Sequence, residues 1–441
     1  MTRRTFFASI TASAASPRRP NVILLLADDL GSGDLSSFGA KDIRTPHIDS
    51  IGARGVRFTQ CYSNGPECSP TRTALMTGRY QQRVGGLECA IGVGNVGRYD
   101  EAIWLQKKGE LGLPASETTM PRLFRQHGYD TACFGKWHLG YLAKHQPRRH
   151  GFDEYFGILG GNADYFTHRE DNGALVLYRN EKPLEAKGYL TDLIAGEAVA
   201  WLKRRKDKPF FLYVPFNAPH TPIQDPDGFD ATTGSAKVQQ GVRGVYAKMV
   251  ERVDARVGAI LDQLRAMGQE ENTIVVFLSD NGGDPNGNNG SLRGRKGSTW
   301  EGGIRVPGMM QWPGHIKPAV SPQVVLSMDL MPTLLAGAGI RAARRLDGVD
   351  LMPVLTGAQE PFARTVFWRY KREKNRRKAV RDGDWKLVVD NGVEELHNLA
   401  ADGGEKVNLL SREPERAAEL RKKLAAWEHD VEASRLRGFR P

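Results

Sequence analysis

Cys68 heads a segment whose residue types could place a reactive group where an anion binds. The segment starts as Cys68-Ser69-Pro70-Thr71-Arg72 and ends as Thr77-Gly78-Arg79. Serine can cap a helix, proline fits its first turn and glycine suits the position after its end, so the segment predicts a short helix with Cys68 at its N-terminus. Free amides at a helix N-terminus attract anions and lower a thiol pKa. The alternative, common for a single cysteine, is a small buried apolar side chain.

Carboxylates follow two continuous apolar runs. Asp28 and Asp29 come directly after the run from Val22 to Ala27, and Asp280 and Asn281 come just after the run from Thr273 to Leu278. Ligation by oxygen alone selects a hard divalent cation, calcium or magnesium, rather than zinc. Each motif alone is more often a helix cap or a turn. Their recurrence at two strand ends favours a metal site.

Four cationic or titratable residues could act on an anion near these carboxylates. Lys136 and His138 follow the short run from Thr131 to Phe134, and residues two apart in an extended segment point to the same face. His220 follows a third apolar run and could be a turn residue or a catalytic imidazole. Lys296 lies in a segment rich in glycine and arginine, where a solvated loop cation is the ordinary alternative.

The elements that must position these residues alternate between strands and helices. Three continuous apolar runs, including the one from Pro209 to Val214, are typical of strands buried on both faces. Helical patterns lie between them, at 119–127, 191–206 and 242–267. This order predicts an α/β fold with a large, mainly parallel sheet sandwiched by helices, in which ligands bind beyond the carboxyl ends of the strands.

The pattern changes after about residue 360. Short strand-like pieces at 365–368 and 385–389 precede a charged helix at about 413–433. We therefore predict a catalytic domain over 21–360 and a small α+β C-terminal domain over 361–441.

The first 20 residues have the composition of an export signal. Arg3 and Arg4 precede Phe6 and Phe7, and a small apolar stretch contains Ala12-Ser13-Ala14, which resembles a twin-arginine signal with a cleavage site. This predicts export to the periplasm, and the alternative is a basic tail on a cytoplasmic protein. No apolar run approaches the roughly 18 residues of a membrane span, so none is predicted.

The composition limits the other function classes. A net charge of +11 could suggest nucleic acid, but no nucleic-acid motif accompanies it and the charge is spread widely. The exception is Arg369 to Lys378, where seven of ten residues are basic; this segment is a solvated loop or a path for a polyanionic substrate. Four cysteines at irregular spacing predict neither a zinc site nor a disulfide framework.

Taken together, these motifs resemble the type I sulfatases of the alkaline phosphatase superfamily, from Asn21 to the C-terminal helix. The segment from Cys68 to Arg79 is similar to the signature in which the cysteine is oxidised to formylglycine before folding, with Thr71 where serine is more usual. The segment from Gly128 to Gly140 is similar to the family's second signature, and Gly151 to Gly157 also resembles the family.

The resemblance implies roles for the residues above. Asp28, Asp29, Asp280, Asn281 and modified Cys68 would bind the metal, calcium or alternatively magnesium. Arg72 and His138 would hold the formylglycine hydrate, while Lys136, His220 and Lys296 would bind the sulfate ester oxygens. A formylglycine-generating enzyme would be a partner during maturation.

The expected activity is that of an arylsulfatase-type sulfuric ester hydrolase, which acts first on a sulfated carbohydrate and alternatively on an aryl sulfate. Two alternatives stay open at this point. One is a phosphodiesterase or phosphonate monoester hydrolase of the same superfamily, and the other is a non-catalytic polyanion-binding protein.

Overall fold

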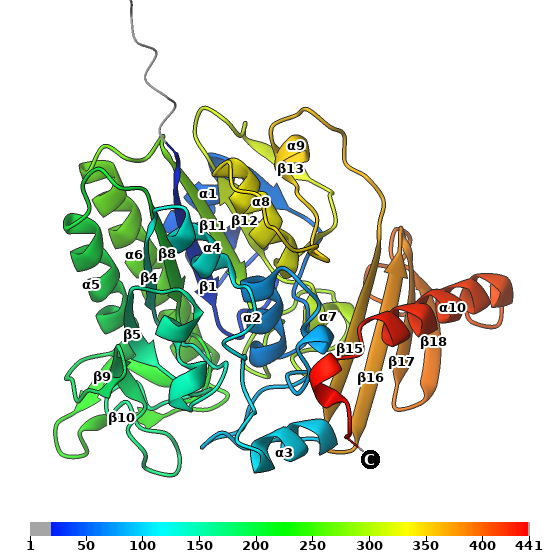
Figure 1. Cartoon of the computed structure of the whole chain (residues 1–441), viewed down its shortest axis with the longest axis horizontal. Coiled ribbons are helices and arrows are strands. Elements are labelled where there is room, and N and C mark those ends of the chain that lie inside the picture. Colours follow the sequence, from blue (N-terminus) through cyan, green and yellow to red (C-terminus); the bar gives the residue numbers. More distant parts are fainter. Residues whose placement is uncertain (1–18, 440–441) are drawn as a thin grey trace, which may run out of the picture.

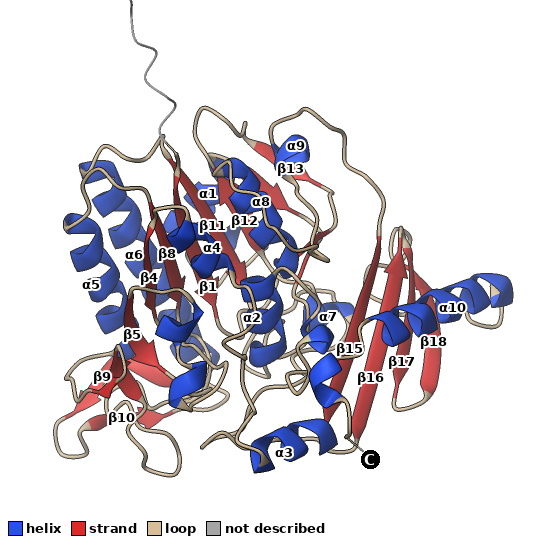
Figure 2. Cartoon of the chain, in the orientation of Figure 1, coloured by secondary structure: helices blue, strands red, loops and turns tan. Residues whose placement is uncertain are grey.

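A large mixed sheet lies between two layers of helices, beside a smaller antiparallel sheet (Figures 1 and 2). The computed structural model describes residues 19–439. From edge to edge the strands of the large sheet are β13 (Ala319–Ser321), β2 (Val56–Phe58), β12 (Gly308–Gln311), β11 (Thr273–Ser279), β1 (Asn21–Ala27), β8 (Phe210–Pro215), β4 (Asp130–Phe134), β5 (Glu154–Ile158), β6 (Leu177–Arg179) and β7 (Lys182–Pro183). The five strands from β11 to β5 are parallel, and antiparallel pairs toward both edges make the sheet mixed. The predicted fold class is confirmed.

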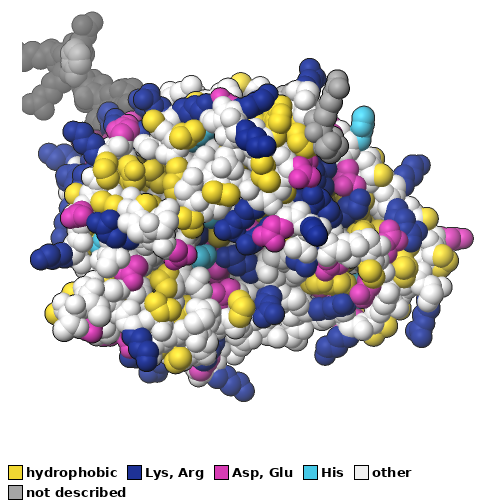
Figure 3. Space-filling model, turned by 90° about the horizontal axis from the view of Figure 1, so that it is seen from below, with side chains coloured by type: hydrophobic (Ala, Val, Ile, Leu, Met, Phe, Trp, Pro, Cys, Tyr) yellow, Lys and Arg dark blue, Asp and Glu magenta, His cyan; other side chains and the backbone are white. Residues whose placement is uncertain are grey.

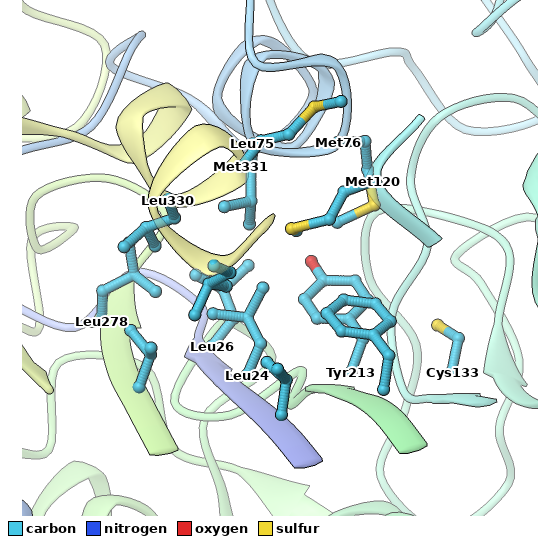
Figure 4. Close-up of a cluster of buried hydrophobic side chains, with 14 of the residues drawn as sticks. Leu24, Leu26, Leu75, Met76, Met120, Cys133, Tyr213, Leu278, Leu330 and Met331 are labelled. Carbon is cyan, nitrogen blue, oxygen red and sulfur yellow. The ribbon is translucent and has the colours of Figure 1, made fainter. Parts of the chain in front are cut away.

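The continuous apolar run of β1 is explained by its two buried faces. Val22, Leu24 and Leu26 pack with α2 (Cys68–Thr77), α4 (Met120–Gln126) and α8 (Leu330–Gly337), whereas Ile23 and Leu25 pack on the other face with α1 (Pro46–Ala53), α5 (Leu190–Lys203) and α6 (Arg243–Ala266). Figure 4 shows the first of these cores, with leucines of β1 facing side chains of α2 and α8. A strand covered on both sides needs no polar face.

The helices predicted at 119–127, 191–206 and 242–267 are α4, α5 and α6, with ends that differ by one to three residues. The remaining helices and strands of the catalytic part are α3 (Asp100–Lys107), α7 (Glu301–Ile304), α9 (Met352–Leu355), β3 (Cys61–Tyr62), β9 (Gln224–Asp230), β10 (Ser235–Val238) and β14 (Val325–Leu326). Among the helices within 19–439, none combines the length and apolar character needed to cross a bilayer. The predicted export signal falls on residues outside the described range.

Four antiparallel strands form the smaller sheet near the C-terminus. They are β15 (Thr365–Arg372), β16 (Asn375–Asp382), β17 (Trp385–Asp390) and β18 (Val393–Asn398), and α10 (Pro414–Asp430) packs on β16 and β17. Leu387 of the sheet and Leu420 of the helix belong to one buried cluster, and Phe367 of β15 stacks on Trp427 of α10 with ring centroids 5.1 Å apart. The domain boundary at residue 360 stays a prediction.

The basic segment from Arg369 to Lys378 is not a loop, so that interpretation was wrong. It forms the turn end of the β15–β16 hairpin, and most of its cations face carboxylates. The pairs are Arg369 with Glu88, Lys371 with Glu101, Arg372 with Glu67, Arg376 with Asp100, Arg377 with Asp390 and Lys378 with Glu428. Except for Asp390 in the neighbouring strand β17, these partners come from segments far away in the sequence. The pairs neutralise a charge that had suggested a path for a polyanion.

Candidate active site

The carboxyl ends of β1 and β11 bring the predicted metal ligands together. Ala27 is in register with Ser279, and the backbone N–H of Asp280 donates to the carbonyl of Ala27 at 3.1 Å. Asp29 in turn donates its backbone N–H to Asp280 Oδ1 at 3.2 Å, and Asn281 Nδ2 donates to Asp29 Oδ1 at 2.7 Å. The side chains of these three residues and of Asp28 are all buried.

This cluster has the chemistry of a site for a hard divalent cation. Asn281 Oδ1 is buried and accepts no hydrogen bond within the described part of the chain. Burial and then the neighbouring Asp28 carboxylate raise the pKa of Asp280 to about 6. A cation would offset the repulsion among these carboxylates and give the amide oxygen a partner, so the residues fit calcium or magnesium.

Cys68 and His220 lie at the same cluster. One ligand atom from each of Asp28, Asp29, Cys68 and His220 lies within 4.8 Å of the others. The sequence placed Cys68 among the metal ligands but assigned His220 to the sulfate ester. The structure brings both beside the carboxylates.

Cys68 is the first residue of α2, as predicted, but its thiol does not have the predicted low pKa. The side chain is buried, and its Sγ lies 3.4 Å from Asp28 Oδ1. Burial and the Asp28 carboxylate raise the pKa of the Cys68 thiol well above its ordinary value, outweighing the nearby lysines. Without a bound cation, an unmodified Cys68 is therefore a neutral thiol and a poor nucleophile.

Ser69 is not the helix cap that the sequence suggested. Glu67 occupies the N-cap position, and the Ser69 hydroxyl instead donates to the carbonyl of His138 at 2.8 Å. Gly78 does end the helix in the left-handed conformation, with φ of 63°. The serine thus connects the helix of Cys68 to the segment of His138.

Lys136 is fixed deep in the site by a close approach of two strands. Gly135 directly follows β4, and a Cβ on it would lie 1.9 Å from the carbonyl oxygen of Pro215 at the end of β8. Only glycine therefore allows the two backbones to approach so closely at this position. The Lys136 backbone N–H donates to that carbonyl, and its Nζ lies 2.5 Å from Asp28 Oδ2 and 3.3 Å from Cys68 Sγ. Lys136 is completely buried.

His138 does not continue an extended segment with Lys136, which corrects the same-face argument. Its φ of 55° is left-handed, a conformation in which histidine is more common than most residues. Its Nε2 lies 2.8 Å from the carbonyl of Ile91, and its Nδ1 has no hydrogen-bond partner among the described residues. The ring lines the cavity above Cys68.

Arg72 is not among the residues that line the cavity. Its Nε and Nη2 contact Asp280 Oδ2 at 3.0 and 2.9 Å, and its Nη1 donates to the carbonyl of Lys136 at 2.6 Å. The guanidinium therefore orients a predicted metal ligand and the backbone of Lys136.

Lys296 and His220 face Asp29 from the open side of the site. Lys296 Nζ lies 2.6 Å from Asp29 Oδ2, and His220 Nε2 lies 3.6 Å from the same oxygen. Burial alone would raise the pKa of Asp29, but Lys296 and His220 hold it well below its usual value. Burial and then Lys296 lower the pKa of His220 to about 3, so its ring is neutral at physiological pH.

These groups surround one small cavity of about 160 Å³, at the side where the parallel strands end. Cys68, His138, His220 and Lys296 line its inner part. Figure 3, which views the molecule from this side, shows lysine, arginine and histidine side chains around a central hollow.

Several lining residues were not among the predicted site residues, although Arg372 lies in the basic segment considered as a path for a polyanionic substrate. The outer part of the cavity is formed by Glu67, Arg98, Asn162, Asp171 and Arg372. They come from loops and from β15, and none belongs to a motif that carries chemistry by itself. Arg372 and Glu67, an ion pair at 2.6 Å, are 305 positions apart, so spacing gave no signal for them.

Comparisons with known proteins agree with one another. A family model described as "Sulfatase" matches residues 20–340, and one described as "N-sulphoglucosamine sulphohydrolase, C-terminal" matches residues 295–430. The chain is 35% identical to N-acetylgalactosamine-6-sulfatase of Homo sapiens, over 78% of this chain and 67% of that protein. It is 33% identical to steryl-sulfatase of Mus musculus, over 80% of this chain and 68% of that protein.

A solved structure, that of Ps i-CgsB in complex with k-i-k-neocarrahexaose, is similar throughout. The TM-score is 0.84 with 32% sequence identity, and the match covers 95% of this chain and 94% of that chain.

Proposed function

The chain belongs to the sulfatase family and is a sulfuric ester hydrolase, and we propose that it cleaves a sulfated carbohydrate through an aldehyde formed from Cys68. One observation carries this proposal: Cys68 begins α2 at the floor of the cavity, between the Asp28 carboxylate and the Lys136 ammonium. The remaining residues of the cavity complete a site for an anionic ester.

Residue 68 supplies the nucleophile in this proposal. A formylglycine hydrate there would provide one hydroxyl to attack sulfur and a second whose deprotonation later expels sulfate. The raised pKa of the Cys68 thiol supports this, because an unmodified residue would be protonated. A thiol that did attack would also lack the second hydroxyl and would remain sulfated.

The cavity residues bind and orient the ester. Lys296 and His220 face the open side of Asp29, where the Lys296 ammonium can donate to sulfate oxygens and to the leaving oxygen. The neutral His220 ring carries its proton on Nδ1, 2.6 Å from the Thr221 carbonyl, so its Nε2 can accept a hydrogen bond. His138 presents an unpartnered ring nitrogen beside Cys68. Lys136 lies against residue 68 and can hold an oxygen of the hydrate. Fixed donors aimed at developing negative charge are the largest contribution in many hydrolases.

A divalent cation completes the site. Asp28, Asp29, Asp280, Asn281 and modified residue 68 would hold it, and calcium fits the oxygen donors, with magnesium as the alternative. When bound, the ion supplies positive charge that offsets the buried carboxylates and stabilises a deprotonated oxygen at residue 68. Arg72 keeps Asp280 in place through two contacts.

A sulfated carbohydrate is the proposed substrate because of the names of two relatives. N-acetylgalactosamine-6-sulfatase acts on a sulfated sugar by name, and the Ps i-CgsB structure holds a neocarrahexaose. Steryl-sulfatase, named for a different leaving group, is comparably similar, so the family alone does not select the alcohol.

Maturation and location belong to the same proposal. A formylglycine-generating enzyme must act on Cys68 before α2 folds, since the side chain is buried afterwards. The sequence from Arg3 to Phe7 would direct the chain to the periplasm. Replacing Arg3 and Arg4 by lysine should retain the protein in the cytoplasm, and cell fractionation measures its location. Unchanged export would contradict the proposed signal.

The decisive experiment combines mass spectrometry with matched substrates. In protein made with a formylglycine-generating enzyme, the peptide that contains residue 68 should carry an aldehyde in place of the thiol. That protein should release sulfate from 4-nitrophenyl sulfate faster than phosphate from 4-nitrophenyl phosphate. An intact thiol in every molecule, or faster phosphate release, would overturn the proposal.

A further inference from the structure

We propose that Arg98 binds a second anionic group of the substrate, a sulfate or carboxylate on the same molecule as the sulfate ester that is cleaved. This inference rests on the proposed function and narrows its substrate class. The ligand would be a sulfated carbohydrate with at least two negative charges within the length of the cavity.

Arg98 has no hydrogen-bonding or ion-pair partner among the described residues, whereas the lysine and the other arginine that line the cavity each contact a carboxylate. Lys296 contacts Asp29 at 2.6 Å and Arg372 contacts Glu67 at 2.6 Å. Within residues 19–439, the Arg98 side chain makes no ion pair or hydrogen bond, yet it lines the same cavity as Cys68. A planar guanidinium with free donors suits the paired oxygens of a sulfate or carboxylate.

The side chain lies toward the reaction site. A Cβ on Gly92 would lie 3.0 Å from Arg98 Nε, so the arginine packs across Gly92. Gly92 follows Ile91, whose carbonyl contacts His138 Nε2 at 2.8 Å. Arg98 is therefore next to the segment that holds His138, which places a second anion beside the first rather than at a remote surface.

Hydrogen bonds within the protein already fix the backbone of the loop that carries Arg98, without a substrate. The N–H of Glu373 donates to the Arg98 carbonyl at 2.5 Å, and Gly97 N–H donates to Gln106 Oε1 at 2.7 Å. Gly92 and Val96 form a backbone bridge at the base of the loop. A preformed backbone lowers the entropy lost when the side chain binds an anion.

Another part of the outer cavity suits sugar hydroxyls. Asn162 and Asp171 line it from a separate loop, and neither side chain has a hydrogen bond within the described range. Asp171 would repel an anion, so the second charge must lie on the Arg98 side. The apolar lining consists of Ala90, Ile91 and Val93, and the described lining residues include no phenylalanine, tyrosine or tryptophan, which favours a polar ring over a flat aryl or steroid group.

The test compares two 4-nitrophenyl galactosides that differ only in a second sulfate. The wild-type enzyme should have a kcat/KM about tenfold higher for the disulfated compound, since a hydrogen-bonded charge pair is worth roughly that factor at a partly exposed site. Arg98→Gln should abolish this preference, and Arg98→Lys should keep part of it. The preference should also fall as salt is raised.

Arg44→Gln is the matched control, because Arg44 is exposed, outside the cavity, and has no described ion pair. It should leave the substrate preference unchanged. Equal kcat/KM values for the two galactosides, or a preference that survives in Arg98→Gln, would overturn the inference while sulfatase activity stands.

A binding measurement separates this result from a failure of the chemistry. Cys68→Ala protein cannot form the nucleophile, and calorimetry should still show tighter binding of the disulfated galactoside, dependent on Arg98. If wild type hydrolyses no ester but this binding difference is present, the proposed function fails and the anion site remains. If Cys68→Ala binds both compounds equally, the inference fails.

Discussion

The ammonium of Lys386 lies 2.9 Å from the carboxylate of Glu301, joining the small C-terminal sheet to the segment that follows Lys296. Lys386 also contacts Glu405 at 2.8 Å, and Glu405 accepts the backbone N–H of Glu301 at 2.7 Å. All three side chains are completely buried. The C-terminal sheet is thus part of the structure that fixes Glu301, five residues after Lys296 in the chain.

Replacing Lys386 by methionine should destabilise the protein strongly. Two buried carboxylates would lose their cation, and breaking a buried ion pair from one side costs about 3–5 kcal/mol. Thermal unfolding should show a lower Tm for Lys386→Met than for Lys374→Met, a change at an exposed lysine in the β15–β16 turn. Similar Tm values for the two variants would contradict this account of the interface.

Lys296→Ala should lower kcat by about 10²-fold, as expected for loss of one fixed donor to developing charge. The ammonium lines the cavity and is held by Asp29, so its loss removes a donor from the position of the ester. The assay is sulfate release from 4-nitrophenyl sulfate. Arg295→Ala changes the exposed neighbour in the same loop and should retain activity; comparable losses in both variants would indicate a loop effect.

Much of the fold could be predicted because its signals are local. A run such as Thr273 to Leu278 has no polar face, so it had to be a strand covered on both sides, and the Asp280 and Asn281 that follow had to lie at the carboxyl edge. The alternation of such runs with helices then determined the class of sheet.

The properties of the site depend on contacts that the sequence does not display. The thiol pKa of Cys68 was predicted from its helix position, but it is set by burial and by Asp28, 40 positions away. Arg372 was part of a basic run, yet it holds Glu67 beside Cys68 from a distant strand. Pairings of this kind follow from the tertiary fold.

Gly161→Ala should reduce kcat with little change in stability. A Cβ at this position would lie 2.5 Å from His138 Cε1, so the ring would have to move, and small displacements of this kind can cost up to about 10²-fold. Gly196→Ala in α5 is the control, because a Cβ there meets no atom within 4 Å. Kinetics and Tm should be measured for both; wild-type kcat in Gly161→Ala would mean that the His138 position is unimportant.

Asp254→Asn should make the protein more stable than wild type at neutral pH but not in acid. Asp254, in α6, accepts the backbone N–H of Ile48 at 2.7 Å, and burial raises its pKa to about 6 from 3.8. The folded state thus holds a proton that the unfolded state releases, so the wild type loses stability as pH rises from about 4 to 6.

Asparagine can accept the same hydrogen bond without a charge. The difference in unfolding free energy between Asp254→Asn and wild type should therefore grow across that pH range to about 3 kcal/mol. Urea denaturation at pH 4, 5, 6 and 7 measures it. A difference independent of pH would show that Asp254 is not the titrating group.

Removal of divalent cations should lower the Tm, and calcium should restore it. Asp28, Asp29 and Asp280 are buried together, and Asn281 Oδ1 has no partner among the described residues, so a bound ion would stabilise the folded state alone. At about 100 times the dissociation constant, the gain is about 2.7 kcal/mol. Differential scanning calorimetry after chelation, with calcium or magnesium added back, measures the effect and identifies the preferred ion.

Asn281→Ala removes one proposed ligand and should shift the calcium dependence of the Tm to higher concentration, whereas Asn272→Ala, remote from the cluster, should not. A chelated enzyme with an unchanged Tm and no response to calcium would mean that the lysines and Arg72 alone balance the carboxylates.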